Sequence, residues 1–203
     1  TGNGGNIDIQ TGYSKSTSSG SFSFKTPNAG KSGVSGGFTY STGDGSKHTG
    51  DSGGFSLSTG NAVGGKAGSM TLKMGTGNVG NGGSFSLDVG DTTGANGDGG
   101  SITVIAGHAN DGGSNDGGSI TVTAGSSSGS GNDDDGGSIT INAGEAATGN
   151  GGNIDIQTGY SKSTSSGSFS FKTPSAGKSG VSGGFTYSTG DGSKHTGDSG
   201  GFS

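Results

Sequence analysis

The feature that most constrains this chain is the regular spacing of its few apolar side chains. Short segments with the pattern Gly-polar-apolar-polar-apolar recur along all 203 residues, and each begins 15 to 19 residues after the previous one. Two apolar residues separated by a Ser, Thr or Asp form the period-two pattern of a half-buried β-strand. A small or medium residue follows at the next position on the same face. Such a chain can bury its apolar side chains only by placing successive segments side by side.

This spacing predicts an all-β fold, a fibrous β-solenoid of stacked coils of 15–19 residues each. The polar connections are too long for a tight hairpin and too short for a helical crossover. An antiparallel β-meander or sandwich is the alternative. A largely disordered chain is the third, since Ile, Leu, Val and Phe together number only 28 residues and fall below the roughly 20% typical of folded domains. The two apolar columns would form an inward ladder: Ile7, Ile9, Phe22, Phe24, Phe38, Tyr40, Phe55, Leu57, Met70, Leu72, Phe85, Leu87, Ile102, Val104, Ile120, Val122, Ile139, Ile141, Ile154 and Ile156.

A longer repeat contains these short segments. Residues 1–56 recur as residues 148–203 with one difference, Asn28 against Ser175. We therefore divide the chain into one long repeat of nine coils, residues 1–147, and the start of the next copy, residues 148–203. Because self-similarity at a fixed period is typical of repeat architectures, we expect this chain to be part of a longer tandem array.

Composition excludes several classes of function. The chain has 53 glycines and no cysteine, so a disulfide framework and thiolate metal sites are excluded. All ten basic residues are lysine, which disfavours nucleic acid as a partner because bidentate phosphate contacts need the arginine guanidinium. No apolar run is long enough to span a membrane.

One short motif resembles an enzyme site. Residues 50–54, Gly-Asp-Ser-Gly-Gly, match the nucleophile loop of chymotrypsin-like serine proteases. A nucleophilic serine also needs a histidine base and an orienting carboxylate within reach. Other segments carry Asn-Gly-Gly or Asp-Gly-Gly at the same place. We interpret the motif as a turn and predict that the protein is not an enzyme.

Acidic loops are the candidate metal site. Carboxylates collect shortly before the apolar segments, where stacked coils would bring their oxygens together, and calcium accepts six to eight oxygen ligands. The candidate calcium ligands are Asp98, Asp111, Asp116, Asp133, Asp134 and Asp135. The alternative interpretation is that these are solvated charges that discourage lateral aggregation. No other cofactor is expected.

The segments also resemble a known group of proteins. Ser-Thr-Ser-Ser-Gly-Ser-Phe-Ser-Phe, Asn-Ala-Gly-Lys-Ser-Gly-Val-Ser-Gly-Gly-Phe-Thr-Tyr-Ser-Thr-Gly and Gly-Gly-Ser-Ile-Thr-Val-Thr-Ala-Gly look like the Gly/Ser/Thr-rich tandem repeats of large extracellular proteins of diatoms and related algae. The resemblance covers the whole chain. It implies a secreted or cell-surface setting, in a wall, mucilage or fibre.

Together these patterns predict a structural component of an extracellular fibre or cell-surface matrix, which associates with itself into filaments. Polysaccharide and O-linked glycans are expected partners, since hydroxyl-rich runs such as residues 161–166 could accept sugars, whereas no Asn-x-Ser/Thr motif is present. The alternative function is a repeat-built adhesin or a carbohydrate- or ice-binding rod. In that case the outward Ser and Thr columns would carry the function.

Overall fold

The computed structural model describes residues 4–46, 48–110, 115–129, 131, 134–192 and 200–201. The chain divides into two units, Thr1–Gly100 and Ser101–Ser203. This division does not coincide with the 147-residue sequence period, whose second copy begins inside the second unit.

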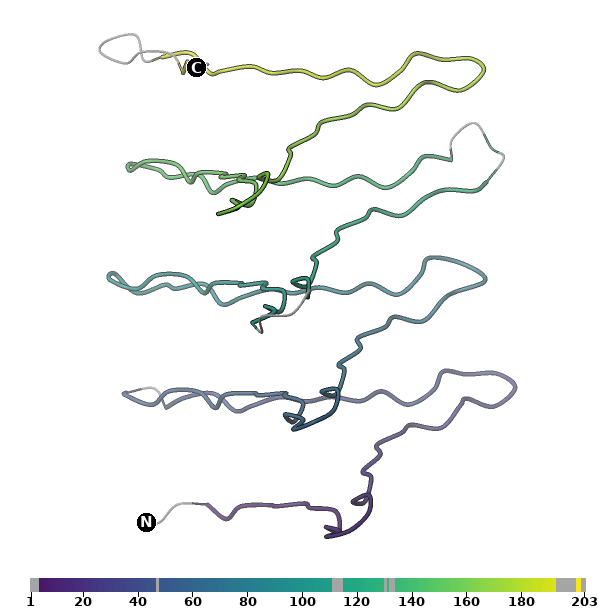
Figure 1. The fold of residues 1–203 in the computed structure, drawn as a ribbon. Helices are drawn as coiled ribbons and strands as arrows, with labels where there is room; N and C mark the ends of the chain where they lie inside the picture. The colour runs from purple at the N-terminus through teal and green to yellow at the C-terminus, as the bar shows by residue number, and fades with distance from the viewer. Residues whose placement is uncertain are drawn as a thin grey trace. The chain divides into compact units, whose positions relative to one another are not determined.

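Within the described ranges the chain forms no helix and no strand. The predicted β-solenoid is therefore wrong, and the alternative β-meander or sandwich lacks the strands that it needs in the same ranges. Figure 1 shows extended stretches of chain that alternate with long loops, drawn as a plain tube without arrows. The apolar segments take the extended backbone that their sequence favours, but their described residues form no strand.

The backbone hydrogen bonds explain why extended segments do not become strands. A strand needs a ladder of consecutive bonds to a neighbour. The described residues contain seven backbone hydrogen bonds outside regular elements, and six of these join one glycine to another across a loop. Each of the six stands alone, so the ladder does not continue into the apolar segment. Two large apolar side chains per coil are too few to offset the conformational entropy lost when some 15 to 19 residues are ordered.

No side chain in the described part of the chain is buried. The twenty residues of the predicted inward ladder are between 50% and 92% exposed, with Met70 and Ile7 at the two limits. The accessible surface of the chain is 20315 Å², more than twice the roughly 8,400 Å² expected of a folded monomer of this mass. The apolar columns are therefore present on the chain but uncovered.

Glycine conformation shapes some of the loop tips. Three-residue bends lie at residues 31–33, 63–65 and 78–80, and each contains a glycine with positive φ: Gly33 at 135°, Gly64 at 78° and Gly80 at 82°. A residue with a Cβ is strained in that region. The valines beside these glycines, Val34, Val63 and Val79, are at least 89% exposed. The loops therefore add no apolar cover to the columns.

Candidate functional site

Six of the loops close at a neck formed by two chain positions. Each apolar segment ends with a third residue on the same face as its two large apolar residues, which we call the third same-face position. The first neck position is the residue directly after it, and the second neck position is the glycine that opens the next segment. Gly20 donates its N–H to the Gly12 carbonyl oxygen at 2.9 Å, and Gly118 donates to Gly107 at 2.8 Å. The same bond recurs from Gly100 to Gly90, Gly137 to Gly125, Gly152 to Gly144 and Gly167 to Gly159. The neck is thus a repeated element of the chain.

The second neck position leaves little room for a side chain at most of these necks. A Cβ added to Gly100 would lie 3.1 Å from the Val89 Cβ, and one added to Gly118 would lie 3.1 Å from the Gly107 nitrogen. Val89 and Met74, which occupy the third same-face position, are also the least exposed large apolar side chains of the described residues, at 42% and 39%. A side chain at Gly100 or Gly118 would therefore crowd the residues at the end of the preceding segment.

Substitution of a neck glycine should open its loop. In Gly100→Ala we expect the 2.9 Å bond from Gly100 to Gly90 to weaken or break, because the new methyl group must move away from Val89 and Gly90. A hydrogen bond contributes about 0.5–1.5 kcal/mol, so amide exchange at residue 100 should accelerate roughly 2- to 10-fold. Hydrogen exchange measured by NMR tests this. The control is Gly99→Ala, where a Cβ meets nothing within 4 Å. Equal acceleration in both variants would contradict the role of the neck.

Aromatic rings form a continuous run of contacts over three successive segments of the first unit. The ring centroids are 4.8 Å apart for Phe22 and Phe24, 5.8 Å for Phe24 and Phe38, 5.3 Å for Phe38 and Tyr40, and 5.6 Å for Tyr40 and Phe55. These separations and the tilted or edge geometries lie in the favourable range for aromatic pairs. The columns predicted from the sequence thus meet side by side in this part of the chain, although they remain exposed.

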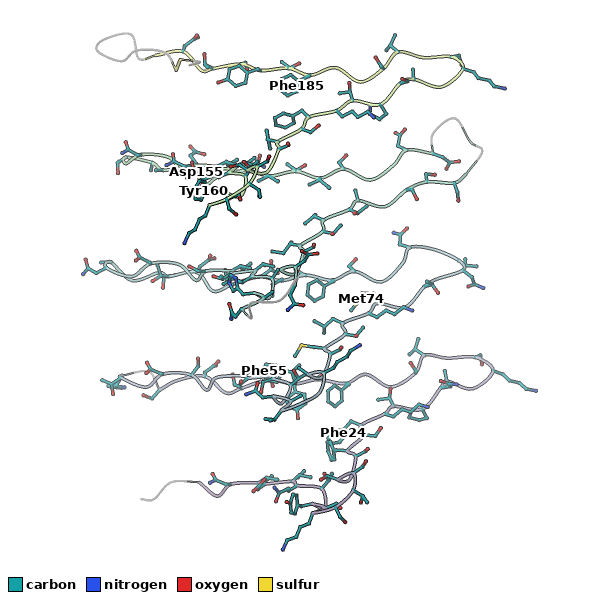
Figure 2. All side chains as sticks on the ribbon, viewed as in Figure 1. Phe24, Phe55, Met74, Asp155, Tyr160 and Phe185 are labelled. Atoms are coloured by element: carbon teal, nitrogen blue, oxygen red, sulfur yellow. The ribbon has the colours of Figure 1, made fainter. Side chains whose placement is uncertain are left out.

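The second unit repeats this arrangement. Phe169 and Phe171 lie 4.5 Å apart in an edge geometry, and Phe171 and Phe185 lie 5.3 Å apart. These rings are the copies of Phe22, Phe24 and Phe38 at an offset of 147. Figure 2 shows Phe24 and Phe55 on the first unit and Phe185 on the second. Equal sequences therefore adopt similar local structure in two separate units.

Shallow hollows lie beside these rings. One of about 350 Å³ is lined by Phe24, Lys25, Thr26 and Phe38. Its copy of about 320 Å³ is lined by Phe171, Lys172, Thr173 and Phe185. A third, of about 330 Å³, is lined by Tyr40, Ser41, Thr42 and Phe55. Each combines two aromatic rings with hydroxyl groups, and the first two add an ammonium group.

Hydroxyl groups hold the tips of two loops. Ser14 and Thr17 share a hydrogen bond of 2.9 Å, and the Thr17 N–H donates to the Ser14 Oγ at 3.1 Å. The copy of this turn joins Ser161 and Thr164 at 2.9 Å in both bonds. Local hydroxyl bonds of this kind are typical of turns. The run expected to accept O-linked sugars, residues 161–166, therefore lies at an ordered loop tip.

The candidate calcium ligands do not form a site in the described residues. Asp98, Asp116, Asp134 and Asp135 are exposed, whereas Asp111 and Asp133 lie outside the residues that the structure describes. The Asp134 carboxylate accepts a hydrogen bond of 2.7 Å from the Gly131 N–H, so it caps its own loop. No group of three or more His, Asp or Glu side chains able to hold a metal ion gathers in that part of the chain.

Sequence reasoning found the columns but missed the necks and the hollows. The signal for the neck was visible, since a glycine opens every apolar segment and a glycine or proline follows each third same-face position. The hollows gave no signal, because Lys25 and Thr26 look like ordinary polar residues at the end of a segment. Their juxtaposition with Phe38 depends on how two successive segments meet.

Comparisons with protein-family models, curated proteins and solved structures find no match to this chain. None of the described ranges contains a helix that is long and apolar enough to cross a membrane.

Proposed function

We propose that this chain is a non-catalytic structural component of an extracellular fibre or cell-surface matrix, and that it associates with itself through its apolar columns. The observation that carries the proposal is the exposure of those columns. Large apolar side chains recur at regular intervals in both units, and each of the predicted ladder residues is at least half exposed. Contiguous exposed apolar surface on a water-soluble chain marks a site of association.

Association between copies would cover the apolar surface that a single copy leaves exposed. Burial of apolar surface contributes about 25 cal/mol per Å², and the chain carries far more accessible surface than a folded monomer of its mass. A regular array of equivalent segments lets each added copy make the same contacts, so that growth continues. The hydroxyl-rich loops and the resemblance to algal tandem-repeat proteins both favour a hydrated extracellular setting.

Sedimentation velocity and electron microscopy across a concentration series test this function. We expect monomers below a critical concentration and filaments above it. A chain that stays monomeric at the highest attainable concentration, at both low and physiological salt, would overturn the proposal.

The hollows favour a second candidate, a saccharide-binding repeat. Aromatic rings offer apolar faces to sugar C–H groups, hydroxyl groups donate and accept hydrogen bonds, and lysine attracts an acidic sugar. The same set of residues, two Phe, one Lys and one Thr, lines the hollow at Phe24 and its copy at Phe171, in two separate units.

Removal of the two hollow lysines tests this second candidate. We expect Lys25→Gln combined with Lys172→Gln to weaken binding of a uronic acid oligosaccharide at each hollow by up to roughly fivefold, because an exposed charge contact contributes at most about 1 kcal/mol. Isothermal titration calorimetry measures the change. Lys15→Gln combined with Lys162→Gln is the control, since it removes equal charge outside the hollows. Equal losses of affinity in both variants would show that binding depends on general charge attraction and not on the hollows.

The acidic loops raise the question of whether their aspartates bind calcium. Asp134 is satisfied by its own loop backbone, so we expect these carboxylates to act as solvated charges and chelation to leave assembly unchanged. Light scattering of the assembled protein before and after addition of a calcium chelator measures this. A loss of filaments on chelation, restored by calcium and not by magnesium, would instead support calcium ligation by the aspartates.

A further inference from the structure

Charge and side-chain size are divided along the long repeat into two sections. Residues 9–87, the basic section, contain six lysines and two aspartates. Residues 88–155, the acidic section, contain ten carboxyl groups and no lysine. The two sections fill one period of 147 residues, and residues 156–203 begin the next basic section with four lysines and two aspartates.

The apolar columns change at the same boundary. All aromatic residues of the period lie in the basic section, where the columns hold Phe, Tyr, Leu and Met apart from Ile9. The acidic section contains no Phe, Tyr or Trp, and its columns hold Ile and Val with Ala at most of the third same-face positions. Five rings of the basic section, from Phe22 to Phe55, contact one another in sequence. A bulky section and a slim section therefore alternate along the chain.

These side chains are available to a partner. The ladder residues Phe24 and Phe38 of the basic section are 63% and 61% exposed, and Ile120 and Ile139 of the acidic section are 57% and 54% exposed. The charged groups that the structure describes in the two sections are exposed too, including Lys66 and Lys73 in the basic section. Both sections thus present apolar columns flanked by charges of a single prevailing sign.

The distribution of charge favours one register between two associating copies. Two copies in register would place lysines against lysines and ten carboxylates against ten carboxylates, which like-charge repulsion disfavours. A shift by one section opposes the six lysines of one copy to the carboxylates of the other. Each exposed pair is weak, but all of the pairs favour the same register. The shift also places the aromatic columns of one copy against the Ile and Val columns of the other. Large side chains can then interdigitate with small ones at high packing density.

We propose that the partner that covers the apolar columns is a second copy of this chain, shifted by one section so that the basic section of one copy lies against the acidic section of the next. This inference rests on the proposed function, because it assigns the register of that self-association. Each copy then leaves one section free to engage a further copy, so the contact is open and continues into a filament.

Zero-length crosslinking tests the register. Equal amounts of ¹⁴N- and ¹⁵N-labelled protein are assembled at low salt, treated with a carbodiimide and digested, and mass spectrometry identifies lysine–carboxylate links that join the two labels. We expect mixed-label links from Lys25, Lys66 and Lys73 to carboxylates of residues 88–155. Mixed-label links confined to Asp44 and Asp51 of the basic section would indicate copies in register and overturn the proposal.

Two charge variants provide a matched second test. The combined Lys31→Gln, Lys66→Gln and Lys73→Gln variant should raise the critical concentration at low salt at least tenfold. The combined Asp44→Asn and Asp51→Asn variant removes charge of the opposite sign from the same section and should leave the critical concentration unchanged or lower it. A rise of similar size in both variants contradicts the shifted register.

The outcomes separate this inference from the function on which it rests. Filaments that form with in-register links or with equal effects of the two variants would sink the shifted register while the structural function stands. A chain that never assembles would sink the structural function itself. In the shifted arrangement, raising the salt concentration to about 1 M, where charges are screened beyond about 3 Å, should raise the critical concentration of the unaltered chain and remove the difference between the two variants.

Discussion

Replacing Ile120 and Val122 together by aspartate is expected to raise the critical concentration for assembly at least about 100-fold. The two side chains stand 57% and 72% exposed on the single chain, so the substitution removes only partial apolar cover within the chain itself. In an assembly, each would lose about 1.5–3 kcal/mol of burial, and about 3 kcal/mol in total corresponds to roughly 150-fold. Burial of two unpaired carboxylates adds to the cost. Sedimentation of the assembled fraction against total concentration measures the effect.

The matched control replaces the alternating residues Thr121 and Thr123 by aspartate. This variant adds the same charge at the same place, but the period-two pattern of the extended segment puts these residues on the opposite face. We expect its critical concentration to change less than tenfold. Equal loss of assembly in the two variants would show that charge, and not the apolar columns, controls association.

Replacing Phe24 and its copy Phe171 by alanine is expected to have the second largest effect, an increase of roughly 100-fold in the critical concentration. Phe24 contacts Phe22 and Phe38, and Phe171 contacts Phe169 and Phe185. Each substitution therefore removes one large apolar side chain and two ring contacts, and a ring contact contributes about 0.5–1.5 kcal/mol beyond its buried area. The same sedimentation assay measures this change.

Leucine at the same two positions separates the two contributions. Leucine keeps most of the apolar surface but removes the aromatic geometry, so we expect the critical concentration to rise roughly tenfold, well below the alanine value. Near-ultraviolet circular dichroism of the free chain should lose the same aromatic signal in both variants. If leucine is as harmful as alanine, the ring contacts rather than buried area determine association.

The fold was only partly predictable from the sequence. The extended apolar segments and the loops between them follow from local pattern, and identical sequences at residues 12–20 and 159–167 close with the same 2.9 Å bond in two units. The strands of a β-solenoid were predicted from the same pattern, and that prediction was wrong. A strand forms only where a neighbouring segment is held in register beside it. The spacing of apolar residues along one chain does not by itself provide the free energy for that pairing.

The candidate functional site was also only partly predictable from the sequence. The columns, the acidic loops and the hydroxyl-rich run at residues 161–166 are visible in the residues themselves. The ring run from Phe22 to Phe55 and the hollow at Phe24 and Phe38 needed coordinates, because both depend on contacts between segments 14 or more residues apart. The calcium hypothesis assumed that stacked loops would gather several carboxylates, but Asp134 instead accepts a bond from Gly131 three residues away.

By itself, the sequence determined where apolar side chains recur, where loops begin and end, and how charge alternates along the 147-residue period. The apolar spacing and the charge alternation are properties of the residue order, and the ends of several loops follow from local bonds such as that from Gly20 to Gly12. Only the tertiary structure decided whether the apolar columns are covered, and within the described residues they are not. The physical reason is that two large side chains per coil cannot offset the entropy of ordering that coil, so cover must come from another surface.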